Sequence, residues 1–361
     1  MNEQKIKALI DAFGIPVTVT GWKPYGHGHI NDTFLIETPA GVDNFILQRK
    51  NHNIFKNIQG MMNNIVLATN HIRKKLLAAG ELQPDRKVMT YISDKANNYF
   101  VRDDEGNFWT LFLFIRDSHG IETVTYPDQA FSAGKAFGIF QNQLSDLQGN
   151  LLIETIPNFH NGKFRYGQFK DAIKLDAAGR VPAMQPVIDK LLSRADEMTR
   201  LQDWLDTGDL PLRITHNDTK INNVLFDEND DILCIIDLDT VMPGSALFDF
   251  GDAIRTLGNT APEDEPQTEK IGFNREYYES FARGYLSESA KFLTSLEREN
   301  LAFSCQYMVW EQSIRFLTDY LNGDTYYKIA YPEHNKVRTL SQVRYLEVLD
   351  ENLSFMVQAT R

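Results

Sequence analysis

The residues whose types and spacing point most clearly to chemistry lie in one segment beyond the middle of the chain. The stretch 216–223 has the spacing His-x-Asp-x-Lys-x-x-Asn, and an apolar run beyond the next turn ends in Asp237. The β-prone runs on both sides of that turn predict a hairpin. A hairpin brings a loop and a strand end side by side, so we expect Asp218, Asn223 and Asp237 to lie close together. Oxygen atoms gathered there could meet a hydroxyl group and hold Mg²⁺.

This spacing is typical of enzymes that transfer a phosphoryl group from ATP. In a protein kinase, His-Arg-Asp is followed by Asn at the same offset and then by a metal-binding Asp. We therefore interpret Asp218 as the catalytic base and Lys220 as a contact to the γ-phosphate. Asn223 and Asp237 are the expected magnesium ligands. His-x-Asp alone more often marks a hydrogen-bonded turn, and the added Asn and Asp favour the catalytic interpretation.

A glycine turn near the N-terminus adds weaker support. Gly26 and Gly28 precede Asn31 between two β-prone runs, at the point where kinases fold a loop over the phosphates. Glycine lets backbone N–H groups approach phosphate oxygens. The same pattern also fits an ordinary hairpin. Two histidines alone make a poor metal site, so a metal at His27 and His29 is disfavoured.

The lysine that pairs with phosphates in kinases has no counterpart at its usual place. Gln48 occupies that position near the end of the predicted third strand. No glutamate occurs between Thr38 and Gly80, so the usual lysine–glutamate pair cannot form there. Arg49 or Lys50 could substitute, or Mg²⁺ and the glycine turn could hold the phosphates. Arg49 as an ordinary surface cation is an equally good interpretation.

Two further acids, Asp249 and Asp252, follow the hairpin. They are expected at the start of a helix, where acids are favourable near the positive end of the helix dipole. N-terminal capping is one interpretation of these residues. Bracing of the 216–223 segment is the other.

The elements that must position these residues fall into two halves. Periodicity predicts a helix at 5–13, β-rich runs at 17–20, 33–36 and 45–49, a helix at 61–77, and strands at 99–101 and 109–115. Further helices are predicted at 130–144, 184–205, 273–285, 295–321 and 334–356, around a β-rich stretch at 212–238. We predict an α+β, bilobal, protein-kinase-like fold, with a small β-rich lobe over 1–116 and a larger helical lobe over 117–361. The adenine is expected against Phe114 and Ile115, at the hinge.

At these residues the sequence resembles the aminoglycoside phosphotransferase and choline kinase superfamily, whose motif is His-x-Asp followed by Asn and a later Ile-Asp. It is more closely similar to the bacterial N-acetylhexosamine 1-kinases, which share glutamine at the position of Gln48. The matching stretches span nearly the whole chain and comprise 28–31, 45–48, 215–223, 235–240, 242–245, 247–252, 315–321, 331–335 and 337–339.

The resemblance implies an ATP- and Mg²⁺-dependent kinase acting on the anomeric hydroxyl of N-acetylglucosamine or N-acetylgalactosamine. Besides the base and the metal ligands named above, it implies Asp239 as a second acid near the metal or the sugar. Arg315 would hold sugar hydroxyls, although an i,i+4 pair with Glu311 on a helix is an equally good interpretation. The expected nucleotide contacts are Gly26, Gly28, Asn31, Gln48, Phe114 and Ile115, and the expected sugar contacts are Asp218, Arg315, His29 and Asn31.

The composition excludes several other classes of protein. The chain of 361 residues carries a net charge of −12, so it lacks the basic footprint of a nucleic-acid-binding protein. It contains no apolar run of about 18 residues that would span a membrane, and its N-terminus lacks the apolar stretch of a signal peptide. Cys234 and Cys305 are expected as buried free thiols in a reducing compartment. We expect a cytoplasmic protein, favoured as a monomer, whose partner is a small sugar.

Two other functions fit the same residues. One is another small-molecule kinase, acting on an amino alcohol, an amino acid or an aminoglycoside. The other is a non-catalytic nucleotide-binding protein, which the missing lysine–glutamate pair suggests and the intact Asp218, Asn223 and Asp237 oppose. The choice of hexosamine epimer and the tolerance at its 2-substituent are left open.

Overall fold

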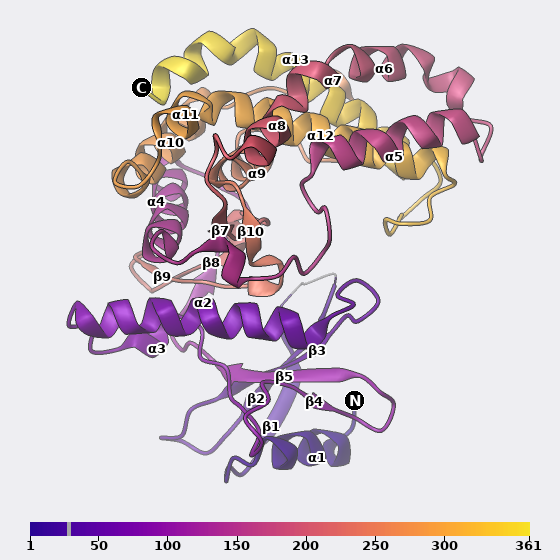
Figure 1. The fold of residues 1–361 in the computed structure, drawn as a ribbon. Coiled ribbons are helices and arrows are strands. Elements are labelled where there is room, and N and C mark those ends of the chain that lie inside the picture. The colour runs from indigo at the N-terminus through magenta and orange to yellow at the C-terminus, as the bar shows by residue number, and fades with distance from the viewer. Residues whose placement is uncertain (27–29) are drawn as a thin grey trace. The chain divides into compact units, whose positions relative to one another are not determined.

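In the computed structural model, which describes residues 1–26 and 30–361, the chain divides into two compact units (Figure 1). The first comprises Met1–His119, Leu152–Pro157 and Leu225–Met242. The second comprises Gly120–Leu151, Asn158–Val224 and Pro243–Arg361. The first unit thus takes in two segments beyond the predicted lobe 1–116.

The first unit is built on a five-stranded antiparallel sheet with the strand order β1-β2-β3-β5-β4. The strands are β1 (Gly21–Pro24), β2 (Asp32–Glu37), β3 (Phe45–Lys50), β5 (Phe108–Leu113) and β4 (Val101–Arg102). Four of the five predicted β runs, 33–36, 45–49, 99–101 and 109–115, overlap strands of this sheet. The strand predicted at 17–20 is wrong, because pairing begins only at Gly21, opposite Glu37.

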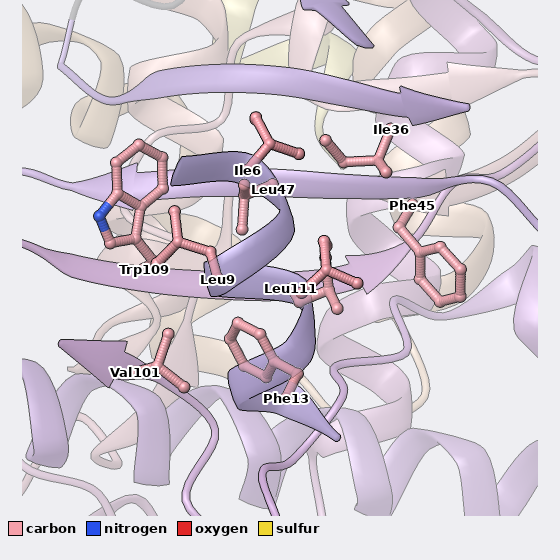
Figure 2. Packing of buried hydrophobic residues seen from close by; sticks show 10 residues of the cluster. Ile6, Leu9, Phe13, Ile36, Phe45, Leu47, Val101, Trp109 and Leu111 are labelled. Carbon is pink, nitrogen blue, oxygen red and sulfur yellow. The ribbon is translucent and has the colours of Figure 1, made fainter. Parts of the chain in front are cut away.

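Helix α1 (Glu3–Phe13) covers one face of this sheet. Asn2 caps the helix by accepting a hydrogen bond from the Lys5 N–H, and Gly14 ends it in the left-handed region, at φ 71°. The core cluster consists of Ile6, Leu9, Ile10 and Phe13 from α1 with Ile36, Phe45, Leu47, Val101, Trp109 and Leu111 from the sheet (Figure 2). Because side chains alternate along a strand, the opposite face of β3 carries Ile46, Gln48 and Lys50.

Helix α2 (Ile58–Ala78) and the hairpin of β8 (Val224–Phe226) and β9 (Ile232–Ile235), which enters this unit at Leu225, complete the first unit. Figure 1 shows α2 on the side of the sheet away from α1. The buried Asn64 of α2 binds the two later segments of this unit, 152–157 and 225–242. Its Nδ2 donates to the carbonyl oxygens of Ile153 (2.7 Å) and Val241 (3.0 Å). Its Oδ1 accepts from the Ile153 N–H at 3.0 Å. This one amide therefore fixes three separate stretches of the chain.

The second unit is mostly helical. Its helices are α4 (Pro127–Leu144), α5 (Gly162–Leu175), α6 (Val181–Ser193), α7 (Ala195–Met198), α8 (Arg200–Thr207), α9 (Ala246–Leu257), α10 (Arg275–Ser289), α11 (Ser295–Glu299), α12 (Leu301–Leu321) and α13 (His334–Ala359). Shorter elements of the chain are α3 (Pro84–Lys87), β6 (His119–Gly120), η1 (Gly149–Leu151), β7 (Arg213–Thr215), η2 (Ile221–Asn223), η3 (Leu238–Thr240), β10 (Met242–Gly244) and η4 (Thr268–Lys270). A sheet-based unit and a helical unit confirm the predicted α+β class.

Two of the predicted helices are divided in the structure. The single helix predicted at 184–205 is wrong, because α6, α7 and α8 are separated at Arg194 and Thr199. The helix predicted at 295–321 is divided at Asn300 into α11 and α12. At Arg194 (φ −96°, ψ −8°) and Thr199 (φ −69°, ψ −11°) the backbone stays near helical values, so the apolar repeat continues through the breaks. Periodicity alone cannot detect such interruptions.

Glycines allow α4 and α10 to pack backbone to backbone. A Cβ atom on Gly134 would lie 2.1 Å from the carbonyl oxygen of Phe281, and one on Gly284 would lie 2.0 Å from that of Phe131. The close packing lets the Tyr285 hydroxyl of α10 donate to Gln141 Oε1 of α4. Gln141 is thereby oriented toward the functional residues described next.

Two predicted general features can be checked directly. Cys234 and Cys305 are both buried free thiols, as predicted. Within residues 1–26 and 30–361, no helix is both long and apolar enough to cross a membrane.

Candidate active site

The structure brings Asp218, Lys220 and Asn223 together in the second unit. Asn223 Nδ2 donates to the Asp218 carbonyl oxygen (2.9 Å) and approaches Asp218 Oδ2 (3.3 Å). Lys220 Nζ lies 3.1 Å from Asp218 Oδ1, and this contact is the largest cause of the raised pKa of Lys220. The Asp218 side chain is partly exposed, so its carboxylate is both oriented and accessible.

The loop that carries Asp218 is held by two acids of α9. The buried Asp249 accepts from the backbone N–H groups of His216 (3.0 Å) and Asn217 (2.8 Å), and from Gln141 Nε2 (2.6 Å). Asp252 accepts from the Thr219 N–H at 3.0 Å. The bracing interpretation of these acids is therefore confirmed. Neither acid is the N-cap residue, because the Ser245 side chain caps α9, although Asp249 lies in the first turn of that helix as expected.

The pKa values of Asp249 and Asp252 shift in opposite directions, because burial dominates at the first and neighbouring positive charge at the second. Burial raises the pKa of Asp249 above its ordinary value, and the hydrogen bonds it accepts only partly offset this. Burial also disfavours the ionised form of Asp252, but Arg255 and Lys220 outweigh it and lower the pKa of this carboxyl. Arg255 Nη2 lies 3.0 Å from Asp252 Oδ1, so Asp252 remains ionised beneath the loop.

A second group of ionisable side chains contacts the same loop through His160. It includes Glu311 and Arg315 of α12. The buried His160 ring contacts the Asn217 carbonyl oxygen through Nε2 (3.2 Å) and Glu311 Oε2 through Nδ1 (3.6 Å). Glu311 also lies 3.4 Å from Arg315 Nη1 and 3.7 Å from Arg165 Nε. Burial opposes ionisation of Glu311, but Arg315, His160 and Arg165 lower its pKa to about 2.

Arg315 therefore forms the predicted i,i+4 contact with Glu311 and also faces a pocket. Its guanidinium lies 5.1 Å from the ring centroid of Phe159 and 5.9 Å from that of Tyr327. The pocket of about 250 Å³ is lined by Arg165, Gln168, Arg315, Thr318, Asp319, Asn322, Thr325, Tyr326 and Tyr327. Asp319 accepts from the N–H groups of 325, 326 and 327, which holds the aromatic part of the wall in place.

In the first unit, the cation beside the predicted nucleotide residues is Lys50. Its Nζ lies 2.5 Å from Asp239 Oδ1 and also donates to Gln48 Oε1. Arg49 points to the other face of β3 and forms an exposed ion pair with Asp32. The surface interpretation of Arg49 is thus confirmed. Because Gln48 Nε2 donates to Thr33 Oγ1 (3.0 Å), Lys50 and Thr33 together fix the orientation of the Gln48 amide.

Asp237, a predicted magnesium ligand, ends the hairpin of the first unit in a constrained conformation. Its φ of 58° and ψ of 56° lie in the left-handed region, which non-glycine residues adopt rarely and often at functional positions. The oxygen donors of Asp237 and Asn223 are of the kind that suits Mg²⁺. Asn223 uses Nδ2 toward Asp218, so Oδ1 of its amide is not taken up by that contact. Among the described residues no three His, Cys, Asp or Glu side chains form a metal cluster.

The remaining predicted nucleotide contacts belong to the first unit. Gly26 adopts φ 77°, in the region that favours glycine. The Phe114 ring packs edge-on against Tyr25 at 5.5 Å between centroids, and Ile115 is buried. Asn31 contacts Asp239, as described below. Gly28 and His29 lie outside the described residues.

The family follows from comparison with known proteins. Residues 21–291 match the Phosphotransferase enzyme family. The chain belongs to this family. An aminoglycoside phosphotransferase from Alicyclobacillus acidocaldarius is similar in structure, with a TM-score of 0.60 at 11% identity over 97% of this chain and 96% of that one. A choline/ethanolamine kinase family protein from Mesorhizobium loti has a TM-score of 0.55 at 17% identity over 99% of both chains.

A third similar structure is a spectinomycin phosphotransferase solved with ADP and spectinomycin. Its TM-score is 0.55 at 15% identity, over 97% of this chain and 99% of that one. The predicted kinase-like fold is confirmed by these likenesses. This phosphotransferase therefore has a sheet-based unit carrying Gln48, Lys50, Asp237 and Asp239, and a helical unit carrying Asp218, Lys220, Asn223 and Arg315.

Sequence reasoning missed two residues that organise the phosphotransferase loop. His160 lies in an irregular stretch 57 positions before its partner Asn217. Gln141 lies within a predicted helix, 108 positions before Asp249. For Gln141 the available signal was a polar residue on an otherwise apolar helix face, which becomes meaningful only when its partner is known.

Proposed function

We propose that this protein is an ATP- and Mg²⁺-dependent kinase that phosphorylates the anomeric hydroxyl of an N-acetylhexosamine. The observation that carries the proposal is the partly exposed carboxylate of Asp218, held by Asn223 and Lys220 in a loop fixed by Asp249. Membership of the phosphotransferase family supports the reaction class. The sugar rests on the resemblance to N-acetylhexosamine 1-kinases, which extends through residues 331–339.

In this proposal Asp218 accepts the proton of the sugar hydroxyl as the sugar oxygen forms a bond to the γ-phosphorus. The bond between that phosphorus and the β–γ bridging oxygen breaks, and ADP leaves. Lys220 neutralises charge on the γ-phosphate. Asp237 and Asn223 are the proposed magnesium ligands, with the bound Mg²⁺ offsetting the charge of the phosphates. Because the protein forms no covalent bond to the transferred phosphoryl group in this proposal, the rigid positioning of Asp218 matters as much as its basicity.

The pocket beside Arg315 suits a neutral, oxygen-rich acceptor. Arg315 and Arg165 both face Glu311, and Asp319 adds a second carboxylate, so the formal charges of these four groups cancel. Asp319 also lines the pocket, but its two oxygens accept from three backbone N–H groups and from Asn335. Planar donors beside aromatic rings suit sugar hydroxyls and ring faces.

The test is ATP consumption against a panel of acceptors, with phosphorus NMR of each product. N-acetylglucosamine, N-acetylgalactosamine, glucose, choline, ethanolamine and spectinomycin form the panel, and Asp218→Asn is the inactive control. A sugar 1-phosphate from an N-acetylhexosamine is the expected product. A sugar 6-phosphate would refute the anomeric assignment. Turnover of choline or spectinomycin alone would favour the kinase activities named for the similar structures. Binding of Mg·ATP without turnover of any acceptor would favour a non-catalytic protein.

A further inference from the structure

Three stretches of the first unit meet at the carboxylate of Asp239. Its Oδ2 accepts from Asn31 Nδ2 at 2.8 Å, and its Oδ1 lies 2.5 Å from Lys50 Nζ. Asn31 ends the glycine turn, Lys50 ends β3, and Asp239 lies in η3, directly after Asp237 and Leu238. Asp239 thus connects the turn that follows the proposed metal ligand to the sheet and to the glycine turn.

The two charges of this contact are removed from water. Lys50 is 1% exposed and Asp239 is 3% exposed. A buried charge is tolerated only when it is paired and hydrogen-bonded, and removing one partner is strongly unfavourable. The contact extends further through Lys50 to Gln48 and through Asn31 Oδ1, which accepts from the Asn51 N–H at 3.0 Å. Asp239 is therefore part of a connected buried network.

The network bears on whether Asp239 can also ligate a metal. Each of its oxygens already has a donor, and one donor is an ammonium group. A dication placed against this carboxylate would lie close to the buried Lys50 charge and be repelled by it. Mg²⁺ requires near-ideal octahedral geometry and gives up its water reluctantly, so it is poorly served by a carboxylate in this setting.

The network also bears on the missing lysine–glutamate pair. In protein kinases that pair must be in place for the phosphates to be held correctly. Helix α2 contains no aspartate or glutamate, so it cannot supply the acid. Here the acid comes instead from η3, 189 positions after the lysine.

We propose that Asp239 is a positioning residue rather than a metal ligand, and that the Lys50–Asp239 pair locks the Asp237 turn and Asn31 onto β3. This inference rests on the proposed nucleotide-dependent function. Loss of the lock is expected to weaken nucleotide binding, because Asn31 and the Asp237 turn lose their common anchor on β3. Any change in the dependence of binding on Mg²⁺ concentration should be the same in Asp239→Asn and Lys50→Met, because both variants release the same Asp237 turn.

The experiment measures ADP binding by calorimetry over a series of Mg²⁺ concentrations, without any acceptor. The variants are Asp239→Asn, Lys50→Met and the double variant, with Lys50→Arg as the conservative rescue. Arg49→Met is the matched control, because Arg49 lies on the same strand and forms an exposed pair with Asp32. Asn31→Ala removes the hydrogen bond from Asn31 to Asp239 and leaves the Lys50–Asp239 ion pair in place.

Asp239→Asn and Lys50→Met are each expected to weaken ADP binding roughly tenfold, with the double variant no weaker than either single one. Lys50→Arg should recover most of the affinity, Asn31→Ala should weaken binding as well, and Arg49→Met should match the wild type. The Mg²⁺ concentration for half-maximal binding should agree within about twofold between Asp239→Asn and Lys50→Met.

Either of two results would overturn the inference. A large rise in the half-saturating Mg²⁺ concentration for Asp239→Asn, absent in Lys50→Met, would make Asp239 a metal ligand. Effects of the two single variants that multiply in the double variant would show that no lock exists. Failure of the wild type to bind ADP would instead refute the proposed function, so the two failures are distinguishable. Thermal unfolding of each variant verifies that it is folded before binding is compared.

Discussion

Replacing Glu311 with glutamine tests the buried charge cluster of the second unit. Glu311 has no exposed surface and faces Arg315 at 3.4 Å, His160 at 3.6 Å and Arg165 at 3.7 Å. Although burial opposes ionisation, these groups lower its pKa from 4.5 to about 2. That difference corresponds to about 3 kcal/mol of stability when the carboxylate is ionised. Glu311→Gln should lose about this much at neutral pH, and it also leaves Arg315 without its counter-charge.

The sign of the pH dependence follows from the lowered pKa. The ionised form is favoured by folding, so its contribution is complete above the ordinary pKa of 4.5 and disappears as the pH falls toward 2. The stability difference between wild type and Glu311→Gln should therefore shrink as the pH falls through 4.5 toward 2. Urea unfolding at a series of pH values measures it, with the buried Trp310 beside Glu311 as a fluorescent probe.

The control is Glu351→Gln, at an exposed carboxylate that lies 3.3 Å from Arg344. Exposed ion pairs contribute little, so this variant should change stability by less than about 1 kcal/mol at any pH. A Glu311→Gln variant as stable as the control at pH 7 would refute the reasoning. So would a large difference that persists unchanged to pH 3, because the cause would then be packing rather than charge.

Four further outcomes are expected. Asp218→Asn should lower kcat by about 10²–10⁴ with unchanged unfolding, and near-normal turnover would remove Asp218 from the role of base. Arg315→Ala should lose sugar affinity while calorimetry shows unchanged ADP affinity, and the reverse pattern would contradict its placement. Asp249→Ala leaves two backbone N–H groups and one side-chain amide unsatisfied, so urea unfolding should show a loss of about 3 kcal/mol or more. Burial raises the pKa of both thiols, so Cys234 and Cys305 should resist thiol reagents in the native protein and react only after unfolding.

Much of the fold could be predicted because its signals are local. Strands β2 and β3 are β-prone runs on the two sides of a turn, and both appear where the sequence places them. The run at 17–20 is also β-prone, but apart from the Thr20 N–H, which donates to the Glu37 carbonyl oxygen, its pairing with β2 begins only at Gly21, and no local pattern reveals this. The breaks at Arg194 and Thr199 lack Gly and Pro, so they leave no signal in the sequence.

The same distinction between local signals and contacts of distant residues applies to the candidate site. Asp218 and Asn223 are five positions apart, so their contact could be predicted from the spacing of one loop. The support of that loop could not, because Asp249 lies 33 positions from His216 and His160 lies 57 from Asn217. For Lys50, the sequence showed only that the usual acid was missing, and the fold supplies another from a distant turn.

The alternation of the chain between its two units has a consequence for biosynthesis. The chain passes from one unit to the other five times before its end. The β-sheet emerges from the ribosome first, yet Asn64 meets its partners at Ile153 and Val241 only after both segments have been translated. The nascent N-terminal part must therefore wait, incomplete, while much of the helical part is made. For the same reason no single cut can excise either unit as an intact fragment.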